Sequence, residues 1–518
     1  MKKMILWGLI LLMISGFLTG CAHQPIINND ETAMGEVDEE NMPVLTQDSG
    51  PAQGGRLNLF MTTPDTLNPL YSSNKHVRYL SQFIFDSLFL AKGEEDYVNL
   101  LAESLEFSDD GLILDIKLHD GVLFHNGTIL SASDVAFTID AIRQVAERSQ
   151  YEWNIENIDS TKIIDRLNIR LILKKADNNF PAKLTFPILP EQVFKEWPIK
   201  GYDTTQKLIG SGAFRFDRFD GDIISLSRND VWWYATAEGD LDHPVWLNGI
   251  NFIVFDNENK MMQAFQKQQI DVAFVSQGNL DNYSNRTDIL INQYEGDRFE
   301  YILLSPIGVE NNKLANPELR TALFKYLGWY MALDPIAIGQ PAAAEMDEYG
   351  SEGNRVNKED TLKALIGLGM VYDENKNILS YYKNGSKIPF SLSLKYNSLD
   401  IDRLTSGEWV LKALGEIGIQ VRLENSTEQE EKNLVDRGKF DLMILGSRIP
   451  LFSGMHETIT ILKGNLGLQE DAAVIFPLYR KTEAILYNTQ IRGPRLPSWK
   501  NVYSGWMDWY LVKSSIRP

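Results

Sequence analysis

The chain has 518 residues, a formal net charge of −20 at pH 7, 44% hydrophobic and 11% aromatic residues, and a single cysteine. This apolar content is typical of a folded globular protein, and the length suggests about three domain-sized units. The negative charge argues against nucleic acid as a partner. One cysteine excludes an internal disulfide framework, and thiolate catalysis or metal binding with it.

The cysteine, Cys21, ends a segment that has the pattern of a secretory signal peptide. Two lysines precede an apolar run over 4–18, which is shorter than the roughly 20 residues of a membrane-spanning helix. The run ends at "LTGC", which resembles the bacterial lipobox, where a diacylglyceryl group is attached to the cysteine before cleavage. We expect residues 1–20 to be a signal peptide and Cys21 to carry a lipid anchor. The alternative is an ordinary signal peptide with an incidental thiol.

Residues 21–54 are expected to form a lipidated acidic tether. Residues 22–53 contain seven acidic residues and neither Lys nor Arg. Few large apolar residues interrupt the segment, so it cannot bury enough surface to offset the entropy of ordering. An acidic tail that binds a partner is the alternative.

The first half of the body alternates strand and helix patterns. Residues 54–61 are expected to form a strand with Leu57, Leu59 and Met61 on one face. Residues 63–72 read as a loop and 76–89 as an amphipathic helix. Two Asp-Gly turns then separate alternating strands. Ser131 is expected to cap a helix, because Asp134 follows three residues later. Further strands are expected at 168–175 and 222–229.

Two strand–helix–strand patterns follow, at 249–275 and 388–425, and the strand "KFDLMILGS" comes after the second. This alternation predicts α/β lobes with largely parallel sheets. The two patterns suggest two lobes of similar construction.

No catalytic motif is found. The six histidines are scattered, without the spacing that would place two on one helix face beside a carboxylate. His119 and His125 flank one hairpin and could both reach a cation, or they could simply be turn and strand-edge residues. The segment "GSGAF" lacks the spacing of a phosphate-binding loop, and no GxSxG sequence is present. We expect no enzyme activity, no cofactor and no metal site.

The order of segments resembles a known family, the extracellular solute-binding proteins of peptide and nickel ABC importers (family 5). The resemblance runs from Gly55 to the C-terminus. Each matching segment is a weak signal by itself, but seven of them in the order of the family make the resemblance specific. These are "GGRLNLFMTTPDTLNPLYSS", "FHNG" with "ASDV", "IGSGAFRFDRF", "LSRNDVWW", "NPELRTALFKYL", "LGEIGIQVRL" and "GKFDLMILG".

The resemblance implies an α/β fold of the periplasmic-binding-protein-like II class, with two lobes, an inserted third domain and a ligand cleft between the lobes. Hinge closure would then enclose the ligand for presentation to a permease. The implied ranges are 55–89, 208–295 and 483–518 for a discontinuous lobe I, 90–207 for the inserted domain II, and 296–482 for lobe III.

One departure bears on the ligand. Peptide-binding members of the family carry a G-W-x-x-D element whose aspartate pairs with the peptide ammonium. Here the element reads Gly446-Ser447-Arg448-Ile449-Pro450. Because a buried ammonium without a carboxylate costs several kcal/mol, either another acid serves or the ligand is not held by a free amine. Arg448 in the cleft would suit a carboxylate or another anion; alternatively, Arg448 faces solvent.

The ligand-binding candidates carried over by position are Thr63, Pro64, Ser447, Arg448 and Tyr479. The expected protein is a monomeric, extracytoplasmic substrate-binding component of an ABC importer, anchored to the bacterial cell membrane by the lipid on Cys21. It would bind peptides or a peptide-like solute and deliver them to the permease. The alternatives are a receptor lipoprotein that reports a peptide signal, and a nickel or haem carrier of the same fold.

Overall fold

The structure, a computed structural model, describes residues 50–91, 97–145, 149–196, 207–235, 244–276, 280, 282–305, 314–336, 340–341, 354–450, 455–468 and 473–512. These residues belong to one compact unit that spans Asp48–Pro518. The expected signal peptide, Cys21 and nearly all of the expected tether lie outside the described residues. In the described part of the chain, no helix has the length and the hydrophobicity that a membrane span requires.

A first sheet joins segments that are far apart in the sequence, in the strand order β1-β10-β9-β8. The β1 and β10 strands are parallel, and the other neighbours are antiparallel. The alternation expected for β1 is confirmed, because Leu57, Leu59 and Met61 are all fully buried. Helix α2 contacts β1 and β8. The elements are β1 (Arg56–Thr62), α2 (Lys75–Ile84), β8 (Phe214–Phe219), β9 (Ile223–Arg228) and β10 (Gly249–Phe255).

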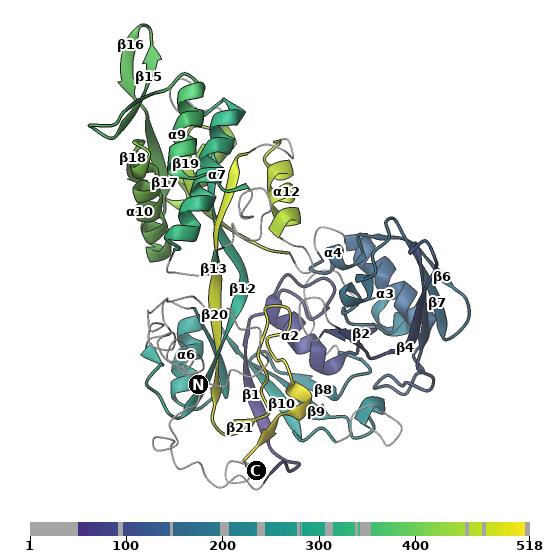
Figure 1. The fold of residues 1–518 in the computed structure, drawn as a ribbon. Helices are drawn as coiled ribbons and strands as arrows, with labels where there is room; N and C mark the ends of the chain where they lie inside the picture. The colour runs from purple at the N-terminus through teal and green to yellow at the C-terminus, as the bar shows by residue number, and fades with distance from the viewer. Residues whose placement is uncertain are drawn as a thin grey trace, which may run out of the picture. The chain divides into compact units, whose positions relative to one another are not determined.

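A second, antiparallel sheet has the order β4-β5-β7-β6, and α3 packs on β6 and β7 (Figure 1). The Asp134 carboxylate accepts hydrogen bonds from the Ser131 backbone N–H and hydroxyl at the start of α3, both at 2.9 Å. Ser131 and Asp134 therefore meet where the sequence predicted the cap. The elements are β4 (Ala102–Phe107), β5 (Ile113–Leu118), α3 (Ala132–Val145), α4 (Glu152–Ile155), β6 (Ile158–Ile163), β7 (Asn168–Leu173) and α5 (Glu191–Phe194).

A third sheet has the order β11-β20-β12-β19-β17-β18, with β13 also paired to β20. Strands β12 and β20 lie side by side over most of their length, and α10 lies against β17 and β18 (Figure 1). The elements are β11 (Val272–Ser276), β12 (Ile289–Leu304), β13 (Gln340–Pro341), β17 (Ser391–Tyr396), α10 (Ile401–Glu416), β18 (Gln420–Asn425), α11 (Glu428–Arg437), β19 (Leu442–Arg448) and β20 (Ile475–Asn488).

The remaining elements are short sheets and further helices. The sheets are β2-β3, β14-β15-β16 and β21-β22. Their bounds are β2 (Phe89–Ala91), β3 (Tyr97–Asn99), α6 (Glu258–Gln266), α7 (Pro317–Leu333), α9 (Lys358–Gly367), β14 (Val371–Asp373), β15 (Ile378–Lys383), β16 (Ser386–Pro389), α12 (Met455–Asn465), β21 (Ile491–Arg492) and β22 (Tyr510–Leu511).

The expectation of largely parallel sheets is wrong. Among the described strands, only the β1–β10, β17–β18 and β17–β19 pairs are parallel. Gly111 and Gly221 adopt positive φ values of 67° and 100° in the tight turns that follow β4 and β8. Tight turns of this kind join antiparallel strands, whereas parallel strands need a long crossover.

The two expected strand–helix–strand units have different outcomes. The second is confirmed, because β17 and β18 flank α10 and pair in parallel from Ser391↔Gln420 to Tyr396↔Asn425. The first is wrong as a single-sheet unit: β10 pairs with β1, while β11 pairs with β20 in another sheet. Its helix, α6, instead buries Met261, Ala264 and Phe265 in a separate apolar cluster. Periodicity predicted the elements but not the sheet that each strand joins.

Candidate functional site

The β12–β20 ladder changes register in its middle. Glu295 pairs with Thr482 and Phe299 pairs with Arg480, so residues 296–298 lie opposite Lys481 alone. A side chain at Gly296 would place its Cβ atom 2.8 Å from the Lys481 carbonyl oxygen, which explains why glycine occupies this position. On one side of the break β20 also pairs with β11, and on the other side β12 pairs with β19. The break is a bulge between two regular stretches of sheet.

Arg448 and Asp297 meet beside this bulge. The guanidinium Nη1 of Arg448 lies 3.5 Å from Oδ2 of Asp297, and their side chains are 50% and 20% exposed. The backbone N–H of Ile449 donates to the Asp297 carbonyl oxygen at 2.7 Å. The altered G-S-R-I-P segment therefore runs directly along the bulge of β12.

The loop that carries Thr63 and Pro64 is held by its own polar groups. The Asn74 side-chain amide donates to the carbonyl oxygen of Thr63 at 3.0 Å and to the Thr62 hydroxyl at 2.9 Å, and its oxygen caps α2. Burial favours the neutral form of Asp65, but hydrogen bonds from Ser72, Ser73 and Thr66 lower the pKa of this carboxyl below its ordinary value. Thr63 is exposed and Pro64 is buried. Thr63 is thus presented to solvent on a braced loop.

His76, in the first turn of α2, packs against this loop. Its Nδ1 lies 3.0 Å from the Thr62 hydroxyl oxygen, and its ring meets that of Phe60 edge-on at 4.7 Å. Burial, and then repulsion by Lys75, Arg78 and Arg448, lower the pKa of His76 to about 3. Of the five predicted ligand-binding residues, Thr63 and Arg448 are exposed.

Ser447 and Tyr479 are placed differently. Ser447 is half-buried and pairs with Phe299 on β12. Tyr479 is fully buried and pairs with Glu300. Burial, and then the negative charge of Glu300, raise the pKa of the Tyr479 hydroxyl far above its ordinary value. Tyr479 therefore belongs to the protein interior behind β12, and not to an exposed surface.

Sequence reasoning missed a buried network of charges on that side of the sheet. Glu300 is 4% exposed, and its carboxylate lies 3.0 Å from Arg403 and 3.5 Å from Lys481. Arg403 also contacts Glu431 at 3.4 Å, and Lys481 contacts Asp402 at 3.2 Å. The signal was weak, because Glu300 is the only acid in the segment "RFEYILL" and a lone acid in a strand resembles an ordinary surface charge. These acids and bases are compensated by one another, as buried charges must be.

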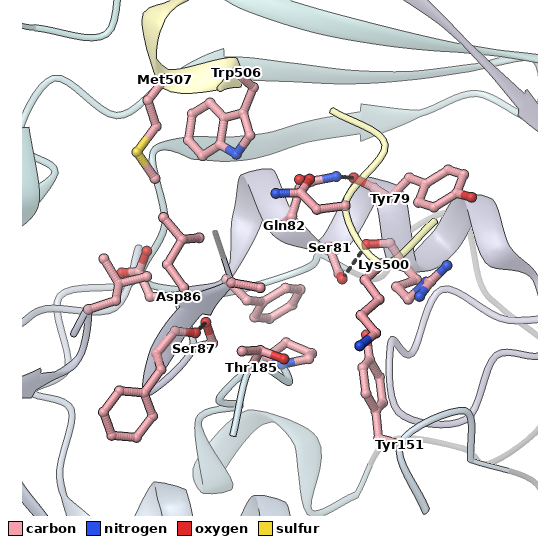
Figure 2. A pocket seen from close by; sticks show the side chains of 18 residues that line it. Tyr79, Ser81, Gln82, Asp86, Ser87, Tyr151, Thr185, Lys500, Trp506 and Met507 are labelled. Atoms are coloured by element: carbon pink, nitrogen blue, oxygen red, sulfur yellow. Dashed lines mark hydrogen bonds between the residues drawn. The ribbon is translucent and has the colours of Figure 1, made fainter. Parts of the chain in front are cut away.

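A cavity of about 100 Å³ lies elsewhere, between α2, residues of the β2–α5 region and the C-terminal segment. Asp86 and Lys500 line it, and Lys500 extends toward Tyr151 (Figure 2). Burial raises the pKa of Asp86 to about 6, although the indoles of Trp233 and Trp232 donate to the carboxylate. None of the predicted ligand-binding residues lines this cavity.

The two histidines considered for a cation have other contacts. The His119 ring packs against that of Trp233, with 4.9 Å between centroids. His125 Nε2 donates to the Gly212 carbonyl oxygen at 2.9 Å, and Nδ1 accepts from the Gly210 N–H at 3.3 Å. Within the described residues, no group of three or more His, Cys, Asp and Glu side chains is arranged to hold a metal ion.

Comparison with known proteins decides the family. The profile of bacterial extracellular solute-binding proteins, family 5 Middle, matches residues 96–455, which is more than half of the chain. The chain belongs to bacterial extracellular solute-binding protein family 5. The resemblance drawn from the sequence is thereby confirmed.

Curated relatives within the family differ in how much they share. The chain is 26% identical over 436 residues to the oligopeptide-binding protein AppA of Bacillus subtilis, which covers 79% of this chain and 76% of the relative. It is 25% identical over 179 residues to the glutathione-binding protein GsiB of Pectobacterium atrosepticum. That second match spans only about a third of either protein.

Solved structures of family members share the fold. The substrate-binding protein CtaP of Listeria monocytogenes aligns with a TM-score of 0.66 at 20% identity, over 89% of this chain and 100% of that one. The Bacillus subtilis AppA complex with a nonapeptide aligns with a TM-score of 0.57 at 21% identity, over 90% and 100%. The α/β fold of periplasmic-binding-protein type that the sequence predicted, with two lobes, is confirmed.

Proposed function

We propose that this protein binds peptides or a peptide-like solute in the cleft between its lobes and delivers them to the permease of an ABC importer. The observation that carries the proposal is the match to an oligopeptide-binding protein over 79% of the chain. The exposed Thr63 and Arg448 would contact the ligand, while Pro64, Ser447 and Tyr479 would hold the adjoining backbone. Closure of the lobes would remove water and strengthen polar contacts with the ligand.

Binding without chemistry is part of this proposal. Ligand would leave the protein as it arrived, because its role is to capture and present a solute. Contacts to the peptide backbone, which all peptides have in common, would supply most of the affinity. Large pockets for the ligand side chains would allow peptides of different sequence to bind.

The proposal is tested by titrating the purified extracytoplasmic body with a library of peptides of two to nine residues, by thermal shift and calorimetry. A ligand at 100 times its Kd should stabilise the folded state by about 2.7 kcal/mol. Nickel–histidine chelates and haem serve as competing candidates. Stabilisation by one of these and by none of the peptides would replace the proposal with a metal or haem carrier.

We also propose that Cys21 carries the lipid that holds the protein on the extracytoplasmic face of the bacterial membrane, with the acidic segment as its tether. The support is the "LTGC" sequence at the end of the apolar run and the acidic composition of residues 22–53. A monomer on such a tether would reach the permease by diffusing beside it.

A further inference from the structure

The G-S-R-I-P segment lacks the aspartate of the G-W-x-x-D element, but a carboxylate from another strand lies beside it. The family resemblance places the aspartate of peptide-binding members at Pro450. The preceding residue, Ile449, donates its backbone N–H to the Asp297 carbonyl oxygen at 2.7 Å. Asp297 belongs to β12, the neighbouring strand, so a carboxylate is supplied to this region from a different part of the chain.

Asp297 is already opposite a cation, and the Arg448 end of the pair is open to solvent. Its Oδ2 lies 3.5 Å from Nη1 of Arg448, and the side chains of Asp297 and Arg448 are 20% and 50% exposed. Solvent around the half-exposed guanidinium weakens the attraction between the two charges. A ligand can therefore reach Arg448 from solvent beside Asp297. The position of Asp297 within the 296–298 bulge leaves it outside the regular β12–β20 ladder.

The nearby acids and bases on the interior side are committed elsewhere. Glu300 is held by Arg403 and Lys481, and it is buried, whereas Asp297 is half-buried. Glu483 accepts a hydrogen bond from the Tyr294 hydroxyl at 2.9 Å. Asp297 in β12 and Arg448 at the end of β19 thus present opposite charges side by side, with Arg448 half exposed.

We propose that Asp297 and Arg448 together recognise an α-amino-acid head group, in which an ammonium and a carboxylate are attached to one carbon atom. The ammonium would donate to Asp297 and the carboxylate would accept from Arg448, so that four charges alternate around a small square. An α-linked peptide end carries only one of these charges on its terminal carbon. A γ-glutamyl peptide carries both on the α-carbon of its first residue. This inference rests on the proposed function and narrows the peptide-like ligand to that class.

Two isomeric tripeptides test the proposal, γ-Glu-Ala-Gly and α-Glu-Ala-Gly. They have the same composition and net charge and differ in whether the first α-carbon carries both charges. Calorimetry on the full extracytoplasmic body should give at least tenfold tighter binding of the γ isomer. Equal affinities, a preference for the α isomer, or binding of neither would overturn the proposal.

Variants then assign the two charges. Asp297→Asn and Arg448→Gln should each reduce the γ-over-α preference to less than threefold. The matched control is Arg298→Gln, which removes a neighbouring exposed cation and should leave the preference unchanged. An unchanged preference in both test variants would contradict the assignment. The peptide library distinguishes failure of the head-group proposal from failure of the proposed function. If α-linked oligopeptides bind but the two isomers bind equally, the peptide-binding function stands and the head-group proposal fails.

Discussion

His125 illustrates how a single residue of the family signature acts on the fold. Its two ring nitrogens contact the backbone of Gly210 and Gly212, with Nε2 as donor and Nδ1 as acceptor. This arrangement requires a neutral ring, because a proton on Nδ1 would face the Gly210 N–H. Burial, opposed by the Gly212 carbonyl and reinforced by Arg215, lowers the pKa of His125 from 6.5 to about 4.

The lowered pKa predicts a loss of stability in acid. Between pH 6.5 and 4 the unfolded chain binds a proton at this residue that the folded protein does not bind, so the free energy of unfolding decreases as pH falls. The full contribution is about 3 kcal/mol for a shift of this size. In urea unfolding at pH 7 and 4.5, His125→Gln should show a smaller decrease than the unchanged protein, by roughly 2 kcal/mol. Equal decreases would refute this role.

Residue types and spacing in the sequence predicted contacts between near neighbours in the chain, but not contacts between distant segments. The signature segment was readable because a capped helix leaves a local pattern, as Ser131 and Asp134 do. The Asp297–Arg448 and Glu300–Arg403 pairs join strands and helices far apart in the chain, and each residue alone has the appearance of an ordinary surface charge. Such pairs follow from the order of strands in the sheet, which local periodicity does not determine.

At the scale of elements, β19 depends on a glycine where it passes the buried charges. A Cβ atom at Gly446 would lie 2.6 Å from Oε1 of Glu300 and 3.1 Å from Nη2 of Arg403. These side-chain ends cannot move freely, because they are held in an ion pair with little exposure. Gly446 therefore gives the network its space.

We expect Gly446→Ala to lower the free energy of unfolding by about 1–3 kcal/mol, as overpacking does in a core. Gly415→Ala is the matched control. Gly415 lies in α10 with nothing within 4 Å of the added Cβ atom, so alanine there should be neutral or raise the free energy of unfolding by up to about 1 kcal/mol. Urea unfolding at neutral pH measures both, and equal effects would argue against the packing explanation.

The elements themselves were largely predictable, and their assembly was not. The strand alternation of β1 and the β17–α10–β18 unit followed from hydrophobic periodicity. The separation of β10 and β11 into different sheets was missed, because α6 packs into its own cluster with Phe60 and Ala273 and does not cross over one sheet. A strand–helix–strand pattern is compatible with both arrangements, and tertiary pairing selects between them.

At the scale of the whole molecule, Cys21 is expected to decide where the protein is found. Cys21→Ser should release the protein into the medium and leave peptide affinity unchanged, because the described body lies apart in sequence from the N-terminal segment. Cell fractionation with immunoblotting measures the first result, and calorimetry measures the second. Retention of the variant in the membrane fraction would refute the lipid anchor.

The pairing of β12 and β20 has a consequence for the segment of chain that lies between them. The chain leaves the first part of the third sheet along β12 and returns along β20, and Phe299 and Arg480 are register partners at the crossing. The residues between them therefore start and finish at adjacent points. A change of length within this segment therefore need not alter the register of the strands at the junction. The half that carries β1, β10 and the Thr63 loop can then stay in place while the half that carries Arg448 changes.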